Sequence, residues 1–297
     1  MDGCLRERFL VVDDFLPHDD SLSMRGDIDA HFGNPGNHDP SHQVWNYWHV
    51  PGSYTYLRTT PEKVIAREKV EAFMEALQTW AAWNLGLGGV TWPYLSLYVP
   101  GCLQGLHNDS VNGRLGYVYS LTRNERQTIG GETVLVHDRD LFRSSLDRPA
   151  AGTGLFDLVE PRFNRLTLFD DRIPHAVQRV DGTMDPVEGR LVLHGHISEA
   201  GVVAEGPLAP EAIESLVALA LAQLRNAVAR SVRGVLVLQV EIGPGGEVQQ
   251  LRPILDRLAS NTDEDLEELR REIGHRAGAI RFPAAASGTR ANVPLIF

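Results

Sequence analysis

The sequence predicts an α+β protein whose main part is a double-stranded β-helix (jelly roll) with supporting N-terminal helices, followed by a small α-β-β-α-β C-terminal domain. Two observations favour this fold class. Apolar residues recur at helical spacing within residues 62–85, and beyond these residues they alternate with a period of two in short segments. A second change of composition near residue 198 marks the start of the C-terminal part.

The N-terminal third supplies the helices. Residues 9–15 (FLVVDDF) predict a short strand, and a helix is expected to begin near Pro17. Residues 33–61 are rich in Gly, Pro, His and aromatic side chains, and we assign no regular structure to them. Within 62–85, apolar residues recur at spacings of three and four, which predicts an amphipathic helix that ends at a glycine-rich turn.

The next part of the chain predicts the strands of the jelly roll. Its segments are short, rich in β-branched and aromatic residues, and separated by Gly, Pro, Asn or Asp. None of them alternates with a helical pattern, which argues against a parallel nucleotide-binding sheet. The predicted strand segments are 91–99, 113–122, 131–136, 163–170, 175–180 and 189–197.

The C-terminal part predicts a separate domain. A helix that opens near Pro210 is followed by a hairpin around the turn Gly-Pro-Gly-Gly, a second helix and a closing strand. We therefore expect one domain at 1–200, with its jelly-roll core at about 91–198, and a second domain at 205–297.

Bulk composition excludes several classes of function. A net charge of −11 argues against nucleic acid as the main partner, because binding to phosphates needs a basic surface. Cys4 and Cys102 are too few for a disulfide framework, and no apolar run is long enough to span a bilayer. The charged N-terminal segment does not have the pattern of a signal peptide, so we expect a cytoplasmic protein without a membrane partner.

A His-x-Asp pair supplies the first candidate site. Residues two apart on an extended chain point to the same side, so His107 and Asp109 can converge on one metal ion. The spacing alone has little weight, because His18 and Asp20 share it in a segment that we assign to a turn or helix start.

Further residues downstream strengthen the prediction. His175 opens an alternating segment, and two histidines with one carboxylate form the facial set that leaves open positions on a non-haem iron(II) ion. Arg190 begins the next predicted strand, and a guanidinium forks onto a carboxylate through two parallel hydrogen bonds. Together these residues predict a metal site beside a site for a carboxylate.

Residues 94–197 resemble the prolyl-4-hydroxylase-like group of 2-oxoglutarate/iron(II) oxygenases. The matching pieces are Tyr98 followed by Pro-Gly, the His-x-Asp pair, Gly-Gly-Glu at 130–132, Pro-His-x-Val at 174–177, and the arginine that leads a strand. The resemblance implies that His107, Asp109 and His175 bind Fe(II) and are catalytic, and that Arg190 and Tyr98 bind the cosubstrate 2-oxoglutarate.

The same resemblance implies a 2-oxoglutarate-dependent dioxygenase. Such an enzyme uses O₂, with ascorbate as a supporting reductant, and releases succinate and CO₂. The retained carboxylate of Asp109 implies hydroxylation or another oxidation, not halogenation. The spacing from His175 to Arg190 is longer than the family pattern, so Arg179, which is nearer to His175, is the competing anchor for 2-oxoglutarate.

Residues 232–297 resemble the C-terminal domain of TonB-type energy transducers. A strand, a Pro-Gly-Gly turn, a helix that ends in Arg-Phe-Pro and a final strand carry this resemblance. It implies a sheet edge that adds a peptide strand or mediates self-association. The alternative is a domain that only stabilises the fold or a dimer.

Two other functions remain open, as does the substrate. A cupin-like non-oxidative metalloenzyme would bind a metal but not 2-oxoglutarate, and a degenerate oxygenase-fold scaffold would need neither. The substrate of an oxygenase is either a peptide or protein side chain or a small molecule, because a fold does not fix a function. The aromatic segment 45–56 either forms a wall of the substrate site or packs against the long helix.

Overall fold

The computed structural model describes the chain apart from residues 1–3, 6, 39–42, 137–154 and 261–265. Within the described residues, no helix has both the length and the apolar character needed to cross a membrane.

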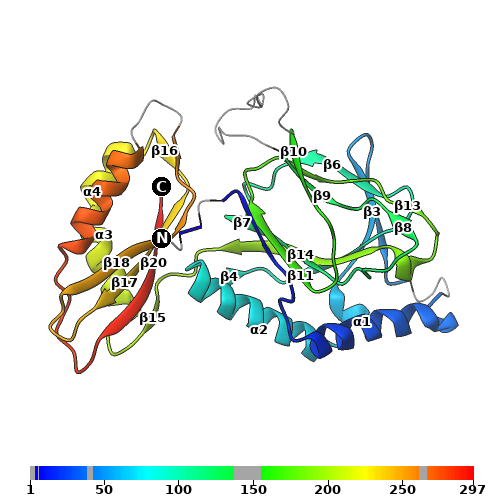
Figure 1. The fold of residues 1–297 in the computed structure, drawn as a ribbon, viewed down its shortest axis with the longest axis horizontal. Coiled ribbons are helices and arrows are strands. Elements are labelled where there is room, and N and C mark those ends of the chain that lie inside the picture. The colour runs from blue at the N-terminus through cyan, green and yellow to red at the C-terminus, as the bar shows by residue number, and fades with distance from the viewer. Residues whose placement is uncertain (1–3, 6, 39–42, 137–154, 261–265) are drawn as a thin grey trace.

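Twelve strands form one strongly curled antiparallel sheet in the first 200 residues (Figure 1). Their order is β1-β11-β7-β14-β5-β3-β6-β12-β9-β10, with β2 paired to β3 and β4 paired to β14. The bounds are β1 Phe9–Val12, β2 Asn46–Val50, β3 Tyr54–Thr59, β4 Gly89–Val90, β5 Tyr94–Tyr98, β6 Leu103–His107, β7 Leu115–Ser120, β9 Thr133–Val136, β10 Phe156–Val159, β11 Arg165–Asp170, β12 His175–Val177 and β14 Arg190–Ser198. A small separate ladder joins β8 Thr128–Ile129 to β13 Asp181–Gly182.

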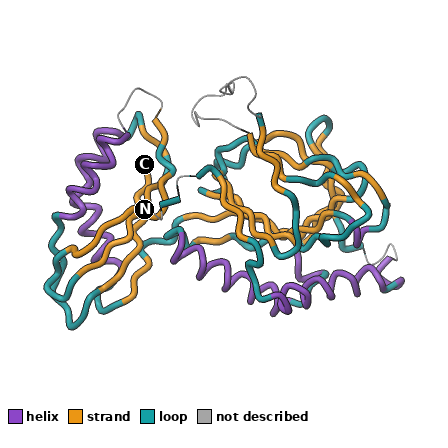
Figure 2. Tube along the Cα trace, in the orientation of Figure 1, coloured by secondary structure: helices purple, strands orange, loops and turns teal. Residues whose placement is uncertain are grey.

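Strand β3 marks the place where the sheet folds over. Its first residues, Tyr54 and Thr55, pair with β6, and its last three pair with β5. One strand therefore joins the two halves of the curl, which face each other in Figure 2. Residues of both halves line a cavity between them. The predicted α+β class and antiparallel β architecture agree with this arrangement.

Two helices cover the outer face of the larger half. They are α1 His18–Gly33 and α2 Arg67–Asn84, and both run beneath the sheet in Figure 1. Alternation along β7 allows the sheet to pack against the helices on one face and to line the cavity with the other. Tyr117 and Tyr119 are buried with Phe73 of α2. Gly116 and Val118, the residues that alternate with these tyrosines, line the cavity on the other face, which Tyr117 also borders.

The structure adds regular elements that the sequence patterns did not predict. The hairpin of β2 and β3 lies within 33–61, and β6 carries His107 at its end. All five residues of β2 are exposed, so no alternation of polar and apolar residues reveals this strand. Short 3₁₀ helices also occur, at Pro35–His38, Pro61–Lys63 and Pro186–Glu188.

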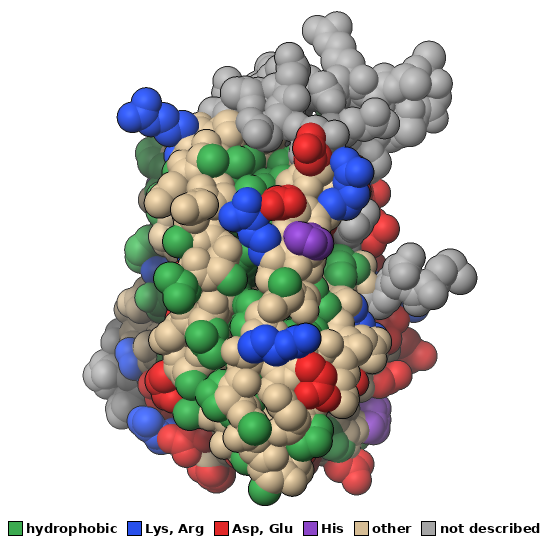
Figure 3. All heavy atoms as spheres, turned by 90° about the vertical axis from the view of Figure 1, so that its left-hand side faces the viewer, with side chains coloured by type: hydrophobic (Ala, Val, Ile, Leu, Met, Phe, Trp, Pro, Cys, Tyr) green, Lys and Arg blue, Asp and Glu red, His purple; other side chains and the backbone are tan. Residues whose placement is uncertain are grey.

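The C-terminal part forms a second, four-stranded sheet in the order β15-β20-β17-β18. Two helices pack against one face of it and enclose a hydrophobic core of their own (Figure 1). Seen from that side, apolar side chains are mixed with charges of both signs (Figure 3). The elements are β15 Val203–Glu205, α3 Pro210–Val228, β16 Val232–Arg233, β17 Val235–Ile242, β18 Val248–Asp256, β19 Ala259–Ser260, α4 Leu266–Gly278 and β20 Thr289–Ile296.

Polar contacts tie the second sheet to the first part of the chain. The side-chain amide of Asn292 donates hydrogen bonds to the carbonyls of Ala82 and Trp83 at the end of α2, at 2.9 and 3.2 Å. Arg257 donates to the buried carboxylate of Asp170 at 2.9 Å. The two parts thus share buried contacts, and the division at residues 200–205 remains a proposal.

Candidate metal centre and its cavity

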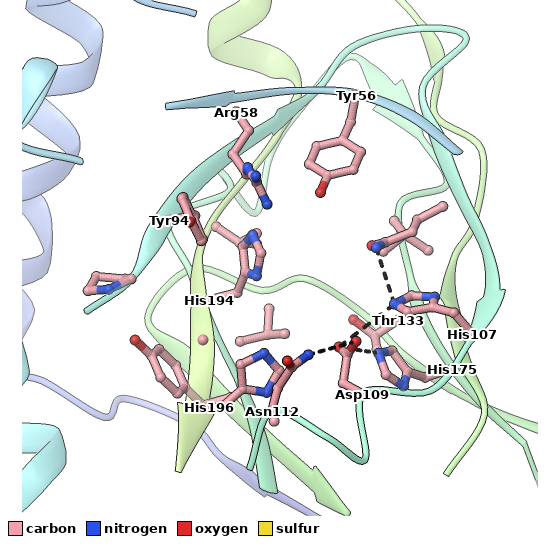
Figure 4. Close-up of a pocket in the computed structure, with 18 of the residues that line it drawn as sticks. Tyr56, Arg58, Tyr94, His107, Asp109, Asn112, Thr133, His175, His194 and His196 are labelled. Atoms are coloured by element: carbon pink, nitrogen blue, oxygen red, sulfur yellow. Dashed lines mark hydrogen bonds and ion pairs between the residues drawn. The ribbon is translucent and has the colours of Figure 1, made fainter. Parts of the chain in front are cut away.

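Two antiparallel strands bring the predicted metal ligands together. His107 is the last residue of β6, His175 is the first of β12, and the two are direct partners in the register. Asp109 follows in the turn after β6, where its backbone N–H donates to the carbonyl of Asp171 at 2.9 Å. One ligand atom from each of the three residues lies within 4.8 Å of the others. Figure 4 shows the three side chains close together at one side of the cavity.

The distances suit a shared ion better than direct hydrogen bonding. Asp109 Oδ2 is 3.5 Å from His175 Nε2 and 3.9 Å from His107 Nε2. The two imidazole rings have centroids 4.2 Å apart. Three donors therefore surround one small space without closing it.

Backbone carbonyls hold both imidazoles in the orientation that a metal needs. Nδ1–H of His107 donates to the carbonyl of Gly105 at 2.8 Å, and Nδ1–H of His175 donates to that of Ile173 at 3.0 Å. In this tautomer the unprotonated nitrogen of each ring is Nε2, the atom that faces Asp109, and such an outer contact is typical of metal-bound histidines.

The electrostatics of the three residues also fit a divalent cation. Burial lowers the pKa of His107, and the neighbouring His175 lowers it further, so the ring is kept neutral. Burial alone would raise the pKa of Asp109, but its interactions with His175 and then His107 outweigh burial and lower it. Two imidazoles and one carboxylate are the donor set of non-haem iron(II) sites.

The three residues lie in the wall of a cavity of about 620 Å³. A cavity of this size accommodates a small-molecule ligand or cofactor. Strand β14 contributes four alternate residues to the lining, as its period of two requires. They are Arg190, Val192, His194 and His196.

Arg190 places a buried positive charge in the cavity. Its side chain is 3% exposed, stacks over the ring of Tyr98 at 4.8 Å, and donates from Nη2 to Thr133 Oγ1 at 3.2 Å. Its Nε is buried without a hydrogen-bond partner, and no carboxylate of the described residues forms an ion pair with it. Burial lowers its pKa, yet a guanidinium stays charged in proteins, so this site favours an anionic ligand.

Gly131 explains one of the sequence pieces that carried the resemblance. Its φ of +81° is a conformation that glycine adopts without strain. A Cβ there would lie 3.1 Å from Cδ and 3.3 Å from Cβ of Arg190. The glycine thus leaves room for the buried arginine.

The structure brings together five of the predicted residues and leaves one outside. Tyr98 donates to Gln104 Oε1 at 3.2 Å, and the amide of Gln104 lies 3.2 Å from His107 Nε2, so Tyr98 connects the Arg190 end of the cavity to the metal centre. Arg179, the competing anchor, is 62% exposed and is paired with Asp181 at 3.4 Å. Its position places it away from the cavity.

Sequence reasoning did not find Asp171, which pairs with His196 behind the candidate metal centre. His196 Nδ1 lies 3.0 Å from Asp171 Oδ2, and the second oxygen of Asp171 is buried without a partner. Burial raises the pKa of Asp171, and the charge of Asp109 raises it further. The alternation of β14 puts His196 on the inner face, but no pattern in the sequence marks Asp171.

Part of the aromatic segment 45–56 lines the cavity, and its first residue packs on α1, not on the long helix α2. Trp48, Tyr54 and Tyr56 line the cavity, so this part forms a wall of it. Trp45 packs away from the cavity and stacks on Phe32 of α1 at 5.7 Å.

Comparison with known proteins gives similar solved structures only. No family model matches the chain, and no curated protein matches it. A Pseudomonas putida prolyl-4-hydroxylase is 17% identical and aligns over 65% of this chain and 94% of its own, with a TM-score of 0.46. A Trichoplax adhaerens prolyl hydroxylase, solved with a peptide fragment of hypoxia inducible factor, is 16% identical over 64% and 82%, with a TM-score of 0.45.

A third structure of the same kind is SnoN, a non-heme alpha ketoglutarate dependent epimerase from nogalamycin biosynthesis. It is 14% identical over 68% of this chain and 80% of its own, with a TM-score of 0.48. Prolyl hydroxylases and 2-oxoglutarate-dependent oxygenases are thus among the structures similar to this chain. At these identities and scores, the functional argument depends on the geometry of the site itself.

Proposed function

We propose that the protein is an Fe(II)- and 2-oxoglutarate-dependent dioxygenase that hydroxylates its substrate and releases succinate and CO₂. One observation carries the proposal. His107, Asp109 and His175 converge within a cavity that also contains a buried arginine with no anionic partner among the described residues. A metal centre and a separate carboxylate anchor are the two features that this chemistry requires of the protein.

Each residue has a definite task in this proposal. His107, Asp109 and His175 would hold Fe(II), which supplies the activation of O₂ when it is bound. Arg190 and Thr133 would bind the distal carboxylate of 2-oxoglutarate. Tyr98 covers one face of the guanidinium and fixes its direction.

Turnover of 2-oxoglutarate tests the proposal. With Fe(II), O₂ and ascorbate, the protein should form succinate, and His175→Ala should abolish the product. Equal turnover in His175→Ala would refute the assignment of the ligands. His275→Ala, which removes a histidine from α4 far along the chain, is the matched control and should leave turnover unchanged.

Binding of 2-oxoglutarate distinguishes the two arginines. Calorimetry on protein loaded with Zn(II) should show that Arg190→Ala weakens binding by roughly tenfold or more, because a charge-assisted pair is lost. Arg179→Ala should have no effect, since that side chain is exposed. The reverse result would move the anchor to Arg179, and no binding by the wild type would favour a non-oxidative metalloenzyme.

The substrate is proposed as either a peptide or protein side chain or a small molecule. The role of the C-terminal domain is a separate proposal. Strand β18 is an edge of its sheet, and Gln249, Gln250 and Arg252 are largely accessible there. Such an edge can add a strand from a peptide or from a second copy of the chain. Light scattering over a range of concentrations tests self-association, and a monomer throughout would contradict it.

A further inference from the structure

A second arginine of the cavity, Arg58, has no role in the function proposed above. It lies on β3, one residue beyond the point where the strand leaves β6 for β5, and its backbone partner is Ser96. Its side chain lines the same cavity as the metal centre. Figure 4 shows the guanidinium pointing into the cavity from the wall opposite His107, Asp109 and His175.

Two aromatic rings fix the position of this guanidinium. Its Cζ lies 3.8 Å from the ring centroid of Trp48 and 4.0 Å from that of Tyr94. Both contacts are cation–π interactions, which hold a cation over the face of a ring. Because the rings lie against the flat guanidinium, the N–H groups at its edge remain available for hydrogen bonding.

No negative charge of the described residues neutralises Arg58. Ion pairs occupy other arginines of the chain, such as Arg114 with Glu199 and Arg123 with Glu188, but none is formed by Arg58. Its neighbour on the cavity wall, His194, is half-buried, and the loss of hydration lowers the pKa of that imidazole to about 3, so it stays neutral. The wall therefore presents a positioned cation without a partner.

We propose that Arg58 recognises a carboxylate of the substrate, so that the substrate is a small organic acid. This inference rests on the proposed function, because Arg190 is assigned there to 2-oxoglutarate and Arg58 remains for the second ligand. A planar, clamped guanidinium suits the two oxygens of a carboxylate through parallel hydrogen bonds. Trp48, Tyr56 and Tyr94 supply apolar surface beside it for the body of such a molecule.

Matched pairs of small molecules test the proposal. Protein that is loaded with Zn(II) and N-oxalylglycine is titrated by saturation-transfer NMR with benzoate and benzamide, N-acetyl-L-proline and its amide, and phenyl phosphate. N-oxalylglycine occupies the Arg190 end, so that an added acid meets Arg58. At least one acid should bind roughly tenfold or more tightly than its amide, the loss expected for a missing charge-assisted pair.

Variants then assign the preference to one residue. Arg58→Gln should abolish the difference between acid and amide, and Arg58→Lys should retain a part of it. Arg162→Gln is the matched control, because Arg162 is exposed and pairs with Glu160 outside the cavity, and it should behave as the wild type. Thermal melting checks that each variant is folded.

Several outcomes would overturn the proposal. They are equal binding of acids and amides, no binding of any acid, a preference that survives in Arg58→Gln, or a stronger response to phenyl phosphate than to the carboxylates. Affinity for N-oxalylglycine alone should be unchanged in Arg58→Gln. If the wild type did not bind N-oxalylglycine, the proposed function would fail, while the comparison of acids with amides on the same protein would still decide the role of Arg58.

Discussion

Gly131 affects the cavity because it has no side chain. Its neighbour Arg190 occupies the space that a Cβ would need, and the glycine has a positive φ as well. Gly52 offers a comparison, because its φ of +75° imposes the same backbone strain with no atom within 4 Å of an added Cβ. Substitutions at the two positions therefore distinguish the effect of backbone strain from the effect of displacing Arg190.

We therefore expect Gly131→Ala to weaken binding of 2-oxoglutarate, while Gly52→Ala costs stability alone. Both should lose about 1 kcal/mol of unfolding free energy through strain at positive φ. Calorimetry with 2-oxoglutarate and thermal melts of both variants measure the two effects. Equal affinity in Gly131→Ala and wild type would show that Arg190 is not held in place for that ligand.

His194 provides a test of the electrostatics of the cavity. Burial lowers its pKa to about 3, with further lowering by the charges of Arg190 and Arg58, and Ser96 lies at 2.8 Å from its Nε2. The unfolded chain takes up a proton at this residue below about pH 6.5, and the folded chain does not, so its contribution to stability falls as pH falls from about 6.5 towards 3.

NMR of the ring protons follows this residue directly. The shifts of His194 should stay those of a neutral imidazole between pH 8 and about pH 5, assigned by comparison with His194→Asn. A titration with a midpoint near the ordinary value of about 6.5 would contradict the burial on which the cavity depends.

At the scale of elements, Asn164 fastens the N-terminal segment to the sheet. It has a φ of +60° and is fully buried just before β11. Its Oδ1 accepts from the N–H of Leu16 at 3.0 Å and from Tyr119 at 2.9 Å, and its Nδ2 donates to the carbonyl of Leu16 at 2.8 Å. These bonds fix the chain where β1 passes into α1.

Asn164→Ala should therefore lower the free energy of unfolding by about 2–4 kcal/mol. Leu16 would lose partners for both backbone groups, and each buried group left unpaired costs about 1–3 kcal/mol. Urea unfolding measures the change, and Asn124→Ala, at a less buried position with one bond to Phe163, should cost much less. Similar losses of unfolding free energy in the two variants would contradict the role of Asn164 in holding the N-terminal segment on the sheet.

Elements could be predicted from the sequence where burial gives them a periodic apolar pattern, and could not be predicted where it does not. Helix α2 and strands β7, β11 and β14 bury one face or both, so their apolar patterns located them. Strand β2 is exposed along its whole length, and β6 owes its conformation to pairing with β12 and β3, which no local pattern encodes.

Residues of the candidate site could be predicted where they belong to a motif with a defined spacing along the sequence. His107, Asp109, His175 and Arg190 were chosen from motifs, and the structure gathers them around one cavity. Arg58 and Asp171 were not, because their surroundings arise from tertiary packing: the rings of Trp48 and Tyr94 for one, and His196 for the other. Such positions depend on contacts between distant segments.

At the scale of the whole molecule, a buried ionic cluster joins the two sheets. Asp170 is 1% exposed and accepts from Arg172 at 2.7 Å and from Arg257 of the second sheet at 2.9 Å. Burial alone would raise the pKa of Asp170, but the two arginines outweigh burial and hold the pKa below its usual value. The carboxylate is therefore charged in the folded protein at every pH at which it is charged in the unfolded chain.

Asp170→Asn should cost about 3–5 kcal/mol of unfolding free energy, because Arg172 and the buried Arg257 both lose their ion pair with this buried carboxylate. Asp13→Asn is the matched control: Asp13 forms the same fork with Arg165 but is 54% exposed, so it should cost less than about 1 kcal/mol. Urea unfolding of both variants measures the difference, and equal costs would mean that the cluster does not join the sheets.

The pH dependence of this cluster has a definite sign. Since the pKa of Asp170 is lowered by folding, its contribution is complete above about pH 3.8 and is lost as pH falls through the lower pKa of the folded state. Wild-type protein should lose more stability on acidification below about pH 4 than Asp170→Asn does. Parallel curves for the two proteins would contradict this assignment.

The most direct test of the central claim is a crystal structure with Mn(II) and N-oxalylglycine bound. The account predicts an anomalous peak in contact with Nε2 of His107, Nε2 of His175 and the carboxylate of Asp109, with the distal carboxylate of N-oxalylglycine on Arg190. Manganese held by other residues, or a distal carboxylate placed on Arg58 or Arg179, would contradict it.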